Sequence, residues 1–184
     1  MYMDLLHFTP ITAASREEIT AYTLTNQSRI CDLAFANLFG WAVKYETSYA
    51  IADDTLFIRF TSPARLHPAY LIPIRRGGGC GSDALDRLCQ EAEVGGYPLV
   101  VMGITPHCRE HLEELCPGAF TFLEDEGAAD YIYLRERLVS LSGKALQSKR
   151  NHVNKFEKLY PDFSYEPITG ANALECLEVE KAWL

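Results

Sequence analysis

The 184-residue chain lacks the long apolar segments and targeting signals that would place it in or across a membrane. One of its longest apolar runs, Leu99–Ile104, is far shorter than the about 20 residues that a spanning helix needs. Residues 1–10 contain neither a basic segment nor a long apolar core, so no signal peptide is indicated. The six cysteines follow no framework spacing, which is typical of reduced thiols. We therefore expect a cytoplasmic protein without a transmembrane segment.

Signatures of several enzyme classes are also missing. The chain has no G-x-S-x-G elbow and no H-E-x-x-H motif, and Gly143-Lys144 lacks the other residues of a P-loop. Cys108, His111 and Cys116 lie close together in sequence, but a fourth zinc ligand at a recognisable spacing is lacking. We expect no metal site and interpret these thiols as small buried side chains.

Positive charge is scarce overall and concentrated in one segment. The chain has 17 basic and 25 acidic residues and a net charge of −8, which argues against a general nucleic-acid coat. Residues 144–158 nevertheless hold a single acidic residue, Glu157, among several basic ones. The basic residues of this segment are Lys144, Lys149, Arg150, Lys155 and Lys158. A local basic element on an acidic body requires an explanation.

The hydrophobic pattern predicts an α/β fold in which antiparallel strands precede β-α-β units. Strands at 45–52 and 55–61 flank Asp53-Asp54, which suits a tight hairpin turn better than a catalytic pair. The continuous apolar run at 98–104 is typical of a central buried strand. The other expected elements are helices at 15–26, 32–41, 82–94, 105–116, 144–160 and from 173 onward, and strands at 69–74, 119–123, 131–134 and 163–166.

A glycine-rich loop, Arg76-Gly77-Gly78-Gly79-Cys80-Gly81, lies between a predicted strand and a predicted helix. Glycines let backbone amides approach a phosphate closely, and the helix start adds free amides and positive potential. Arg75 and Arg76 are suited to clamp the same anion. The alternative is a surface loop followed by a helix cap, because glycine-rich motifs have many false positives.

The pattern R-x-x-G-x-G, formed by Arg76, Gly79 and Gly81, resembles the pyrophosphate loop of the GCN5-related N-acetyltransferase fold. The resemblance covers about residues 45–133. It implies a mixed sheet flanked by helices, and a donor whose phosphates contact Arg75, Arg76, Gly79 and Gly81. Acyl-coenzyme A is then one candidate donor, bound as a substrate and not covalently.

The basic segment forms an amphipathic helix on a helical wheel. One stripe is apolar and contains Leu146, Val153, Phe156 and Tyr160, while Lys144, Asn151, Lys155 and Lys158 lie opposite. Lys149 and Arg150 lie within or beside the apolar stripe, where a cation must be paired or reach solvent. One interpretation is an ion pair with Glu157 or with the acidic loop at 124–130. The other is a cationic site for an anionic substrate, formed by Lys149, Arg150, Asn151 and Lys155.

Four sequence blocks carry a more specific resemblance. They are Cys31 to Trp41, Asp130-Tyr131-Ile132-Tyr133, Leu141-Ser142-Gly143-Lys144, and Gln147 to Phe156. These blocks are similar to a bacterial family, first described as having unknown function, that includes the catalytic C-terminal domain of phosphatidylglycerol lysyltransferase. The resemblance implies two GCN5-like halves in tandem, with residues 1–138 as the first domain. Residues 139–184 would then be a linker helix and the beginning of a truncated second domain.

The same resemblance implies transfer of an acyl or aminoacyl group from an activated donor to an amine, a hydroxyl or a lipid headgroup. For the lysyltransferase the donor is an aminoacyl-tRNA, so tRNA contact through the basic helix is a further hypothesis. The absent C-terminal half is then another partner. Glu124, Asp125 and His152 are the candidates for a general base. The alternative function is a non-catalytic ligand-binding or scaffold half of a tandem protein.

Overall fold

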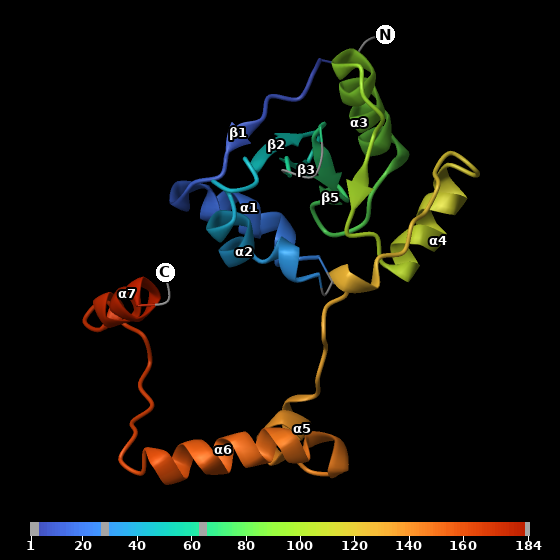
Figure 1. The fold of residues 1–184 in the computed structure, drawn as a ribbon. Helices are drawn as coiled ribbons and strands as arrows, with labels where there is room; N and C mark the ends of the chain where they lie inside the picture. Colours follow the sequence, from blue (N-terminus) through green and yellow to red (C-terminus); the bar gives the residue numbers. More distant parts are fainter. Residues whose placement is uncertain (1–3, 27–29, 63–65, 183–184) are drawn as a thin grey trace. The chain divides into compact units, whose positions relative to one another are not determined.

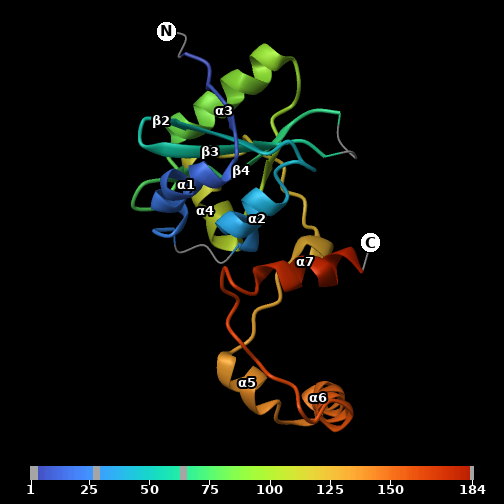
Figure 2. The ribbon, with the colours of Figure 1, turned by 90° about the vertical axis from the view of Figure 1, so that its left-hand side faces the viewer.

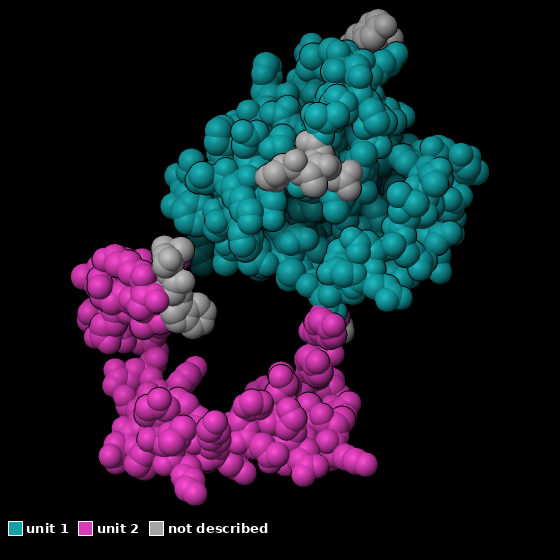
Figure 3. Space-filling view, viewed as in Figure 1, with its two compact units in different colours: residues 1–130 teal, residues 131–184 magenta. Residues whose placement is uncertain are grey.

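The computed structural model describes residues 4–26, 30–62 and 66–182. The chain divides into two compact units, unit 1 at residues 1–130 and unit 2 at residues 131–184, which Figure 3 colours separately. Each unit is described by itself below. The assignment of residues 1–138 and 139–184 to two GCN5-like domains stays a prediction.

Unit 1 is built on a mixed sheet of six strands (Figure 1). The strand order is β1-β2-β3-β4-β6, and β5 also pairs with β3. All the pairs are antiparallel except β4 with β6, which is parallel. The strands are β1 (Thr9–Pro10), β2 (Ser48–Ala52), β3 (Thr55–Phe60), β4 (Ala69–Leu71), β5 (Ile74–Arg75) and β6 (Val101–Met102). The predicted α/β class, with a mixed sheet flanked by helices, is confirmed.

The β2–β3 hairpin closes through the two residues that the sequence indicates. Asp53 and Asp54 have φ angles of 47° and 55°, the left-handed conformation that a two-residue hairpin turn of this type needs. The Thr55 hydroxyl donates a hydrogen bond of 3.2 Å to the Asp53 carbonyl oxygen. The turn thus brings two carboxylates to one end of the hairpin.

The strand opposite β3 contains a β-bulge between β4 and β5. Phe60 lies opposite Ala69 and Leu56 lies opposite Ile74, so four steps along β3 correspond to five steps along its partner. The extra residue falls at Ile72–Pro73, where proline has no amide to donate to the ladder. The Ile72 amide instead donates to the Met102 carbonyl oxygen at 3.1 Å. A bulge redirects a strand, and here it directly precedes the glycine loop.

The helices of unit 1 begin and end at recognisable signals. The Thr105 side chain accepts a hydrogen bond of 3.2 Å from the Cys108 amide, and Pro106 occupies the first turn of α4. Gly96, with a φ of +70°, ends α3 in the left-handed conformation. These helices are α1 (Arg16–Thr23), α2 (Phe35–Gly40), α3 (Ser82–Gly95) and α4 (Pro106–Leu115), with short 3-10 turns η1 (Ala13–Ser15), η2 (Cys31–Leu33) and η3 (Glu126–Ala128).

Apolar side chains fill both faces of the sheet, with α3 on one side and α1 and α2 on the other (Figure 2). Along β3, Phe57 points into one cluster while Leu56 and Ile58 point into the other. Successive strand residues alternate between faces, so a strand buried on both sides is apolar throughout. Leu88 of α3 closes the first cluster and Ile19 of α1 closes the second, and both are fully buried.

Four strand predictions differ from the structure. The run at 98–104 forms only the two-residue β6 at the end of the sheet, not a central strand. Residues 119–123 form no strand. Phe120 and Phe122 alternate as they would in a strand, but they pack directly on the apolar cluster that contains Phe57 and Leu88. Residues 131–134 are extended and exposed, and residues 163–166 are also irregular. Alternating apolar residues favour an extended backbone in these segments, but a β-strand also needs a neighbouring strand with which it can pair.

Unit 2 consists of helices joined by irregular segments. They are α5 (Arg135–Ser140), the 3-10 turn η4 (Lys144–Leu146), α6 (Gln147–Leu159) and α7 (Ala173–Lys181). No residue is buried in the part of unit 2 that the structure describes, residues 131–182.

Among the described residues of the whole chain, none of the helices has the length and apolar character needed to cross a membrane.

Candidate functional site

The glycine loop spans residues 76–81 and joins β5 to α3. The Arg75 amide donates to the Gly79 carbonyl oxygen at 3.1 Å, and the Gly78 amide donates to the Arg75 carbonyl oxygen at 2.9 Å. Gly77, Gly78 and Gly79 have φ angles of +85°, +102° and +84°, a region that other residues rarely adopt. No atom lies within 4 Å of where a Cβ would stand on any of these three glycines. Their backbone is therefore open to an approaching group.

Gly81 is the N-cap residue, directly before the first residue of α3, Ser82. Its φ of −92° and ψ of 161° are ordinary extended values, and it contributes no side-chain cap to the helix. The first amides of a helix have no partner within the helix and carry positive potential. The loop therefore ends on amides that favour a negative group.

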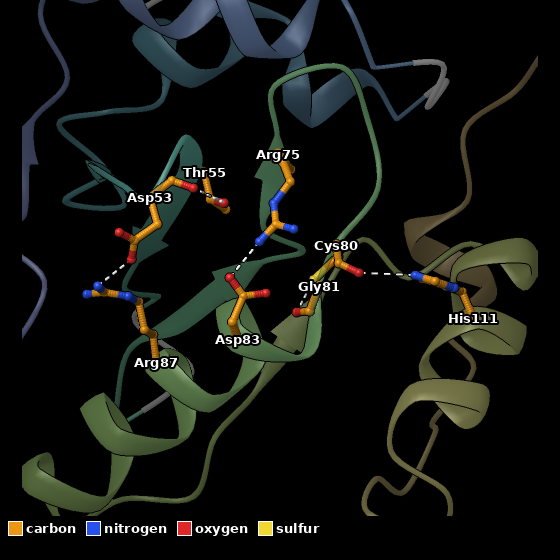
Figure 4. Close-up of polar contacts among 8 residues, drawn as sticks. All are labelled: Asp53, Thr55, Arg75, Cys80, Gly81, Asp83, Arg87 and His111. Carbon is orange, nitrogen blue, oxygen red and sulfur yellow. Dashed lines mark hydrogen bonds and ion pairs between the residues drawn. The ribbon is translucent and has the colours of Figure 1, made fainter. Parts of the chain in front are cut away.

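Arg75 turns back over the start of α3. Its Nη2 donates to Oδ2 of Asp83 at 2.5 Å, as the close-up in Figure 4 shows. A Cβ on Gly81 would collide with Oδ1 of Asp83 and lie 3.1 Å from Nη2 of Arg75. The ion pair thus passes directly over the glycine.

Arg76 is held by the β2–β3 hairpin and by α1. Its Nε lies 2.9 Å from Oδ1 of Asp54, and its Nη2 donates to the Tyr22 hydroxyl at 3.1 Å. The guanidinium carbon lies 4.6 Å from the centre of the Tyr22 ring, close enough for a cation–π contact. The hydrogen bonds with Tyr22 and with Asp54 raise the pKa of Arg76, so this side chain remains cationic.

The two carboxylates of the hairpin turn each have an arginine partner. Asp54 pairs with Arg76, and Asp53 pairs with Arg87 of α3. Figure 4 shows Arg87 reaching Asp53 from the helix. These contacts support the interpretation of Asp53-Asp54 as a turn, and they join the hairpin to the loop and to α3.

Cys80 lies inside the loop with its thiol buried. Burial, and to a smaller extent the charge of Asp83, raises the pKa of this thiol to about 12. The thiolate is the reactive form of cysteine, so Cys80 is not a nucleophile near neutral pH. Its carbonyl oxygen lies 3.0 Å from Nε2 of His111, which must carry the hydrogen because a carbonyl only accepts. His111 therefore joins α4 to the loop.

The predicted anion-binding residues of unit 2 divide into two kinds. Lys149, Asn151 and Lys155 are exposed on α6. Arg150 is half-buried and donates to the Leu141 carbonyl oxygen and, at 2.8 Å, to the Gly143 carbonyl oxygen. Its partners within the described part of unit 2 are thus carbonyl groups, and no ion pair with Glu157 is present there. The alternative pairing with the acidic loop at 124–130 stays a prediction.

The three candidates for a general base lie in dissimilar surroundings. Glu124 is 3.7 Å from Nη1 of Arg109, and Oδ1 of Asp125 accepts a hydrogen bond of 2.9 Å from the Gly127 amide. His152 is exposed on α6. Within the described part of unit 1, neither Glu124 nor Asp125 has a hydrogen bond to the glycine loop. The assignment of a base stays a prediction.

The structure brings Arg75, Arg76, Gly79 and Gly81 together in unit 1, and places Lys149, Arg150, Asn151 and Lys155 in unit 2. Sequence reasoning missed the residues that hold the loop in place: Tyr22, Asp54, Asp83, Arg87 and His111. Asp54 and His111 do stand out in the sequence, but for other roles: Asp54 in a hairpin turn and His111 as a possible zinc ligand. Within the described residues, no three side chains of the metal-ligating types gather to hold an ion.

A groove of about 820 Å³ also lies on unit 1, between α1 and the η2–α2 region. Its lining is mostly apolar, with Arg16 and two threonines. The residues around it are Ala13, Arg16, Thr20, Thr23, Leu24, Ile30, Leu33, Ala34, Phe35, Ala36 and Phe39, and none of them belongs to the glycine loop.

Comparisons with known proteins give one family and one solved structure. The model of the family described as "Phosphatidylglycerol lysyltransferase, C-terminal" matches residues 25–184. The crystal structure of a conserved protein of unknown function from Bacteroides thetaiotaomicron VPI-5482 is 39% identical, with a TM-score of 0.85 over 97% of this chain. This chain spans 59% of the length of that one. No curated protein matches the sequence.

Proposed function

The chain belongs to the phosphatidylglycerol lysyltransferase C-terminal family, and from this premise we propose that it is part of an acyl- or aminoacyltransferase. In this proposal the glycine loop of unit 1 holds the phosphate groups of the activated donor. The acceptor is an amine, a hydroxyl or a lipid headgroup. The family supports a transferase role, and the open glycine loop supports the assignment of the donor site to unit 1.

One observation carries the proposal: an open glycine backbone leads directly into a helix start and is flanked by two arginines. Gly77, Gly78 and Gly79 have no atom within 4 Å of their Cβ positions, so a phosphate can approach their backbone closely. The arginines add donors that match the geometry of phosphate oxygens. The loop follows β5, which continues β4 after the bulge, and β4 pairs in parallel with β6. Open α/β sheets bind ligands at the carboxyl ends of their strands.

The chemistry asks little of the protein beyond positioning. An activated ester and a nucleophile held in contact react far faster than in solution, and donors aimed at the developing oxyanion lower the barrier further. Arg75 and Arg76 would neutralise donor phosphates and fix the donor's position. Neither arginine would take part in bond making.

Thermal-shift titration of this chain with coenzyme A and with acetyl-coenzyme A tests the proposal. A ligand that binds only the folded state, at a hundredfold excess over its dissociation constant, stabilises that state by about 2.7 kcal/mol. We expect a rise in Tm that Arg75→Ala and Arg76→Ala each reduce. An unchanged shift in both variants would remove the loop from the mechanism.

Arg109→Ala is the matched control. Arg109 also faces a carboxylate, Glu124 at 3.7 Å, and an aromatic ring, Phe122 at 4.9 Å, and its side chain is 52% exposed against 53% for Arg76. It differs from Arg76 in lying outside the glycine loop. We expect Arg109→Ala to leave the ligand-induced shift intact, which separates loss of a loop cation from loss of any surface cation.

A second candidate donor is an aminoacyl-tRNA bound through α6. Lys149 and Lys155 are exposed there, and no carboxylate pairs with either among the described residues. Binding of an aminoacylated tRNA would weaken steeply with salt, in proportion to the phosphates neutralised. A flat salt response, or equal binding by Lys149→Ala/Lys155→Ala, would remove this candidate.

The third candidate is the non-catalytic binding or scaffold half. It is favoured by the fact that Arg75 and Arg76 already have carboxylate partners, Asp83 and Asp54. In that case neither coenzyme A nor aminoacyl-tRNA would bind, and the two ion pairs would serve only to fix the loop.

A further inference from the structure

We propose that Asp83 determines the specificity of the glycine loop: its carboxylate occupies Arg75 and covers Gly81 until a polyanionic group displaces it. This inference rests on the proposed function, since it concerns how the donor enters that site. Asp83 would make the loop accept a diphosphate and reject a simple carboxylate.

The position of Asp83 suits it to stand in for an anion. It is the second residue of α3, where a carboxylate is stabilised by the positive end of the helix. It also pairs with Arg75 at 2.5 Å. The positive end of α3 and the Arg75 side chain would both attract a donor phosphate at this end of the loop. Both already interact with the Asp83 carboxylate.

The ion pair lies in the space that a side chain at Gly81 would enter. Gly77, Gly78 and Gly79 need to be glycine because their φ angles are positive, but the φ of Gly81 is −92°, which any residue adopts. What a side chain at Gly81 would meet is the ion pair, since a Cβ there collides with Asp83 and approaches both Nη atoms of Arg75 at 3.1 and 3.2 Å. A ligand reaching the Gly81 backbone has to displace the same pair.

The ion pair is suited to exchange. The side chains of Arg75 and Asp83 are 40% and 55% exposed, and such pairs contribute little to stability. Arg76 is different, because Asp54, the Tyr22 hydroxyl and the Tyr22 ring all hold it. Arg75 is thus the exchangeable cation of the loop and Arg76 the fixed one. A diphosphate offers more charge and more acceptor oxygens than Asp83, whereas a single carboxylate offers no advantage over it.

Isothermal titration with inorganic pyrophosphate, coenzyme A and acetate tests this role in the wild-type chain, in Asp83→Asn and in Asp86→Asn. Asparagine keeps the size of the side chain and removes its charge. Loss of an exposed ion pair of this kind changes binding by up to about fivefold. We expect pyrophosphate and coenzyme A to bind Asp83→Asn about three- to fivefold more tightly than the wild type, and acetate to bind measurably only to this variant.

Asp86→Asn is the matched control, because Asp86 is an exposed acidic residue of the same helix that forms no ion pair with the described residues of the loop. It should tighten binding less than twofold, as expected for a general change in charge. Equal gains in Asp83→Asn and Asp86→Asn would overturn the specific role of Asp83, and so would unchanged binding in Asp83→Asn.

A double-mutant cycle separates this inference from the proposed function. If Asp83 acts through Arg75, then Asp83→Asn gives no gain in an Arg75→Ala background, and the two effects are not additive. If the wild type binds coenzyme A but Asp83→Asn does not tighten it, the role of Asp83 is wrong and the donor site stands. If neither pyrophosphate nor coenzyme A binds any well-folded variant, both the donor site and the role of Asp83 are wrong.

Discussion

Unit 1 and unit 2 use similar apolar residues in opposite ways. Unit 1 buries two clusters, one on each face of its sheet, whereas no described residue of unit 2 is buried. Leu88 of α3 is fully buried, while Leu159 of α6 is 60% exposed. The sheet is the cause of the difference, because it offers two continuous apolar surfaces that helices of unit 1 cover. The stability of the described chain therefore resides in unit 1.

Unit 2 is held by short-range contacts. Arg150 satisfies carbonyl groups near the end of α5, and the Phe156 ring lies 5.1 Å from those of both Tyr160 and Phe163. Isolated helices of this length are marginal in water because the first turn is costly to form. The apolar stripe predicted for α6 is present but has no buried residue, so these helices gain little from the hydrophobic effect within the unit.

The charges of the two units also differ. In unit 1 each arginine around the glycine loop is paired with a carboxylate, and Arg76 is held in addition by the hydroxyl and the ring of Tyr22. In unit 2 the lysines of α6 project from an exposed helix. A fixed cation selects an anion by geometry, whereas a row of exposed lysines attracts polyanions by charge alone. The comparison thus supports the proposal that specific anion recognition belongs to unit 1.

The largest expected difference between the units is in core packing. Leu88→Ala should lower the free energy of unfolding by about 2–5 kcal/mol, because it leaves a cavity in a buried cluster. Leu159→Ala should change it by less than about 0.5 kcal/mol, as is usual for exposed positions. Urea denaturation of the two variants measures both values. Similar losses would mean that unit 2 has a core of its own.

Thiol reactivity gives the next largest difference. Cys80 is buried and has a pKa raised to about 12, whereas Cys176 of α7 is exposed. Because Cys80 is buried and its thiolate form is rare, iodoacetamide at pH 8 should modify the exposed Cys176 at least about a hundredfold faster than Cys80. Mass spectrometry of the digested protein reports both rates. Rapid modification of Cys80 in the folded chain would contradict its burial.

The same raised pKa predicts a loss of stability in alkali. The unfolded chain releases the Cys80 proton at a lower pH than the folded chain does. The contribution of this thiol is therefore complete below about pH 8.5 and is lost as the pH rises toward 12. Cys80→Ala should remove this part of the alkaline decline, which denaturation at several pH values would show.

A pair of glycine substitutions sharpens the comparison at the level of the backbone. Gly79→Ala forces alanine into a φ of +84° and should cost about 1–2 kcal/mol of stability. Gly170→Ala in unit 2 meets open space and no such φ, so it should be neutral or slightly stabilising. Thermal unfolding of the two variants measures this difference. Equal effects would contradict the strained geometry of the loop.

The smallest expected effect concerns the start of α4. Thr105→Ala removes the hydroxyl that accepts from the Cys108 amide and should cost about 1 kcal/mol, while Thr105→Ser should retain most of the stability. Among the described helices of unit 2, α5, α6 and α7 begin without a side-chain cap bond. A loss in Thr105→Ala that Thr105→Ser does not restore would show that the cap is not the cause.

Local signals in the sequence predicted the parts of unit 1 that depend on neighbouring residues. The Asp53-Asp54 turn, the glycine loop leading into α3 and the helix expected at 105–116 are all present. The positions that depend on distant partners were not predictable in this way. The β1 strand exists through its pairing with β2, and the apolar run at 98–104 lies at the end of the sheet because its only described neighbour is β4.

The candidate site follows the same rule. Its predicted residues in unit 1 are nearly contiguous, so the sequence placed them in one loop. The side chains that hold the loop come from elsewhere: Tyr22 and Asp54 lie far from Arg76 along the chain, and His111 comes from α4. No spacing in the sequence indicates such ion pairs, since folding alone brings these segments together. Whether the loop binds a donor stays a prediction.

Hydrogen exchange in the presence of coenzyme A tests the central claim, that unit 1 holds the activated donor on its glycine loop. Amide protection reports where a ligand fixes the backbone. The account predicts that coenzyme A slows exchange at residues 77–85, leaves α6 unchanged, and has less effect in Arg75→Ala. Protection confined to α6, or none in either unit, would contradict it.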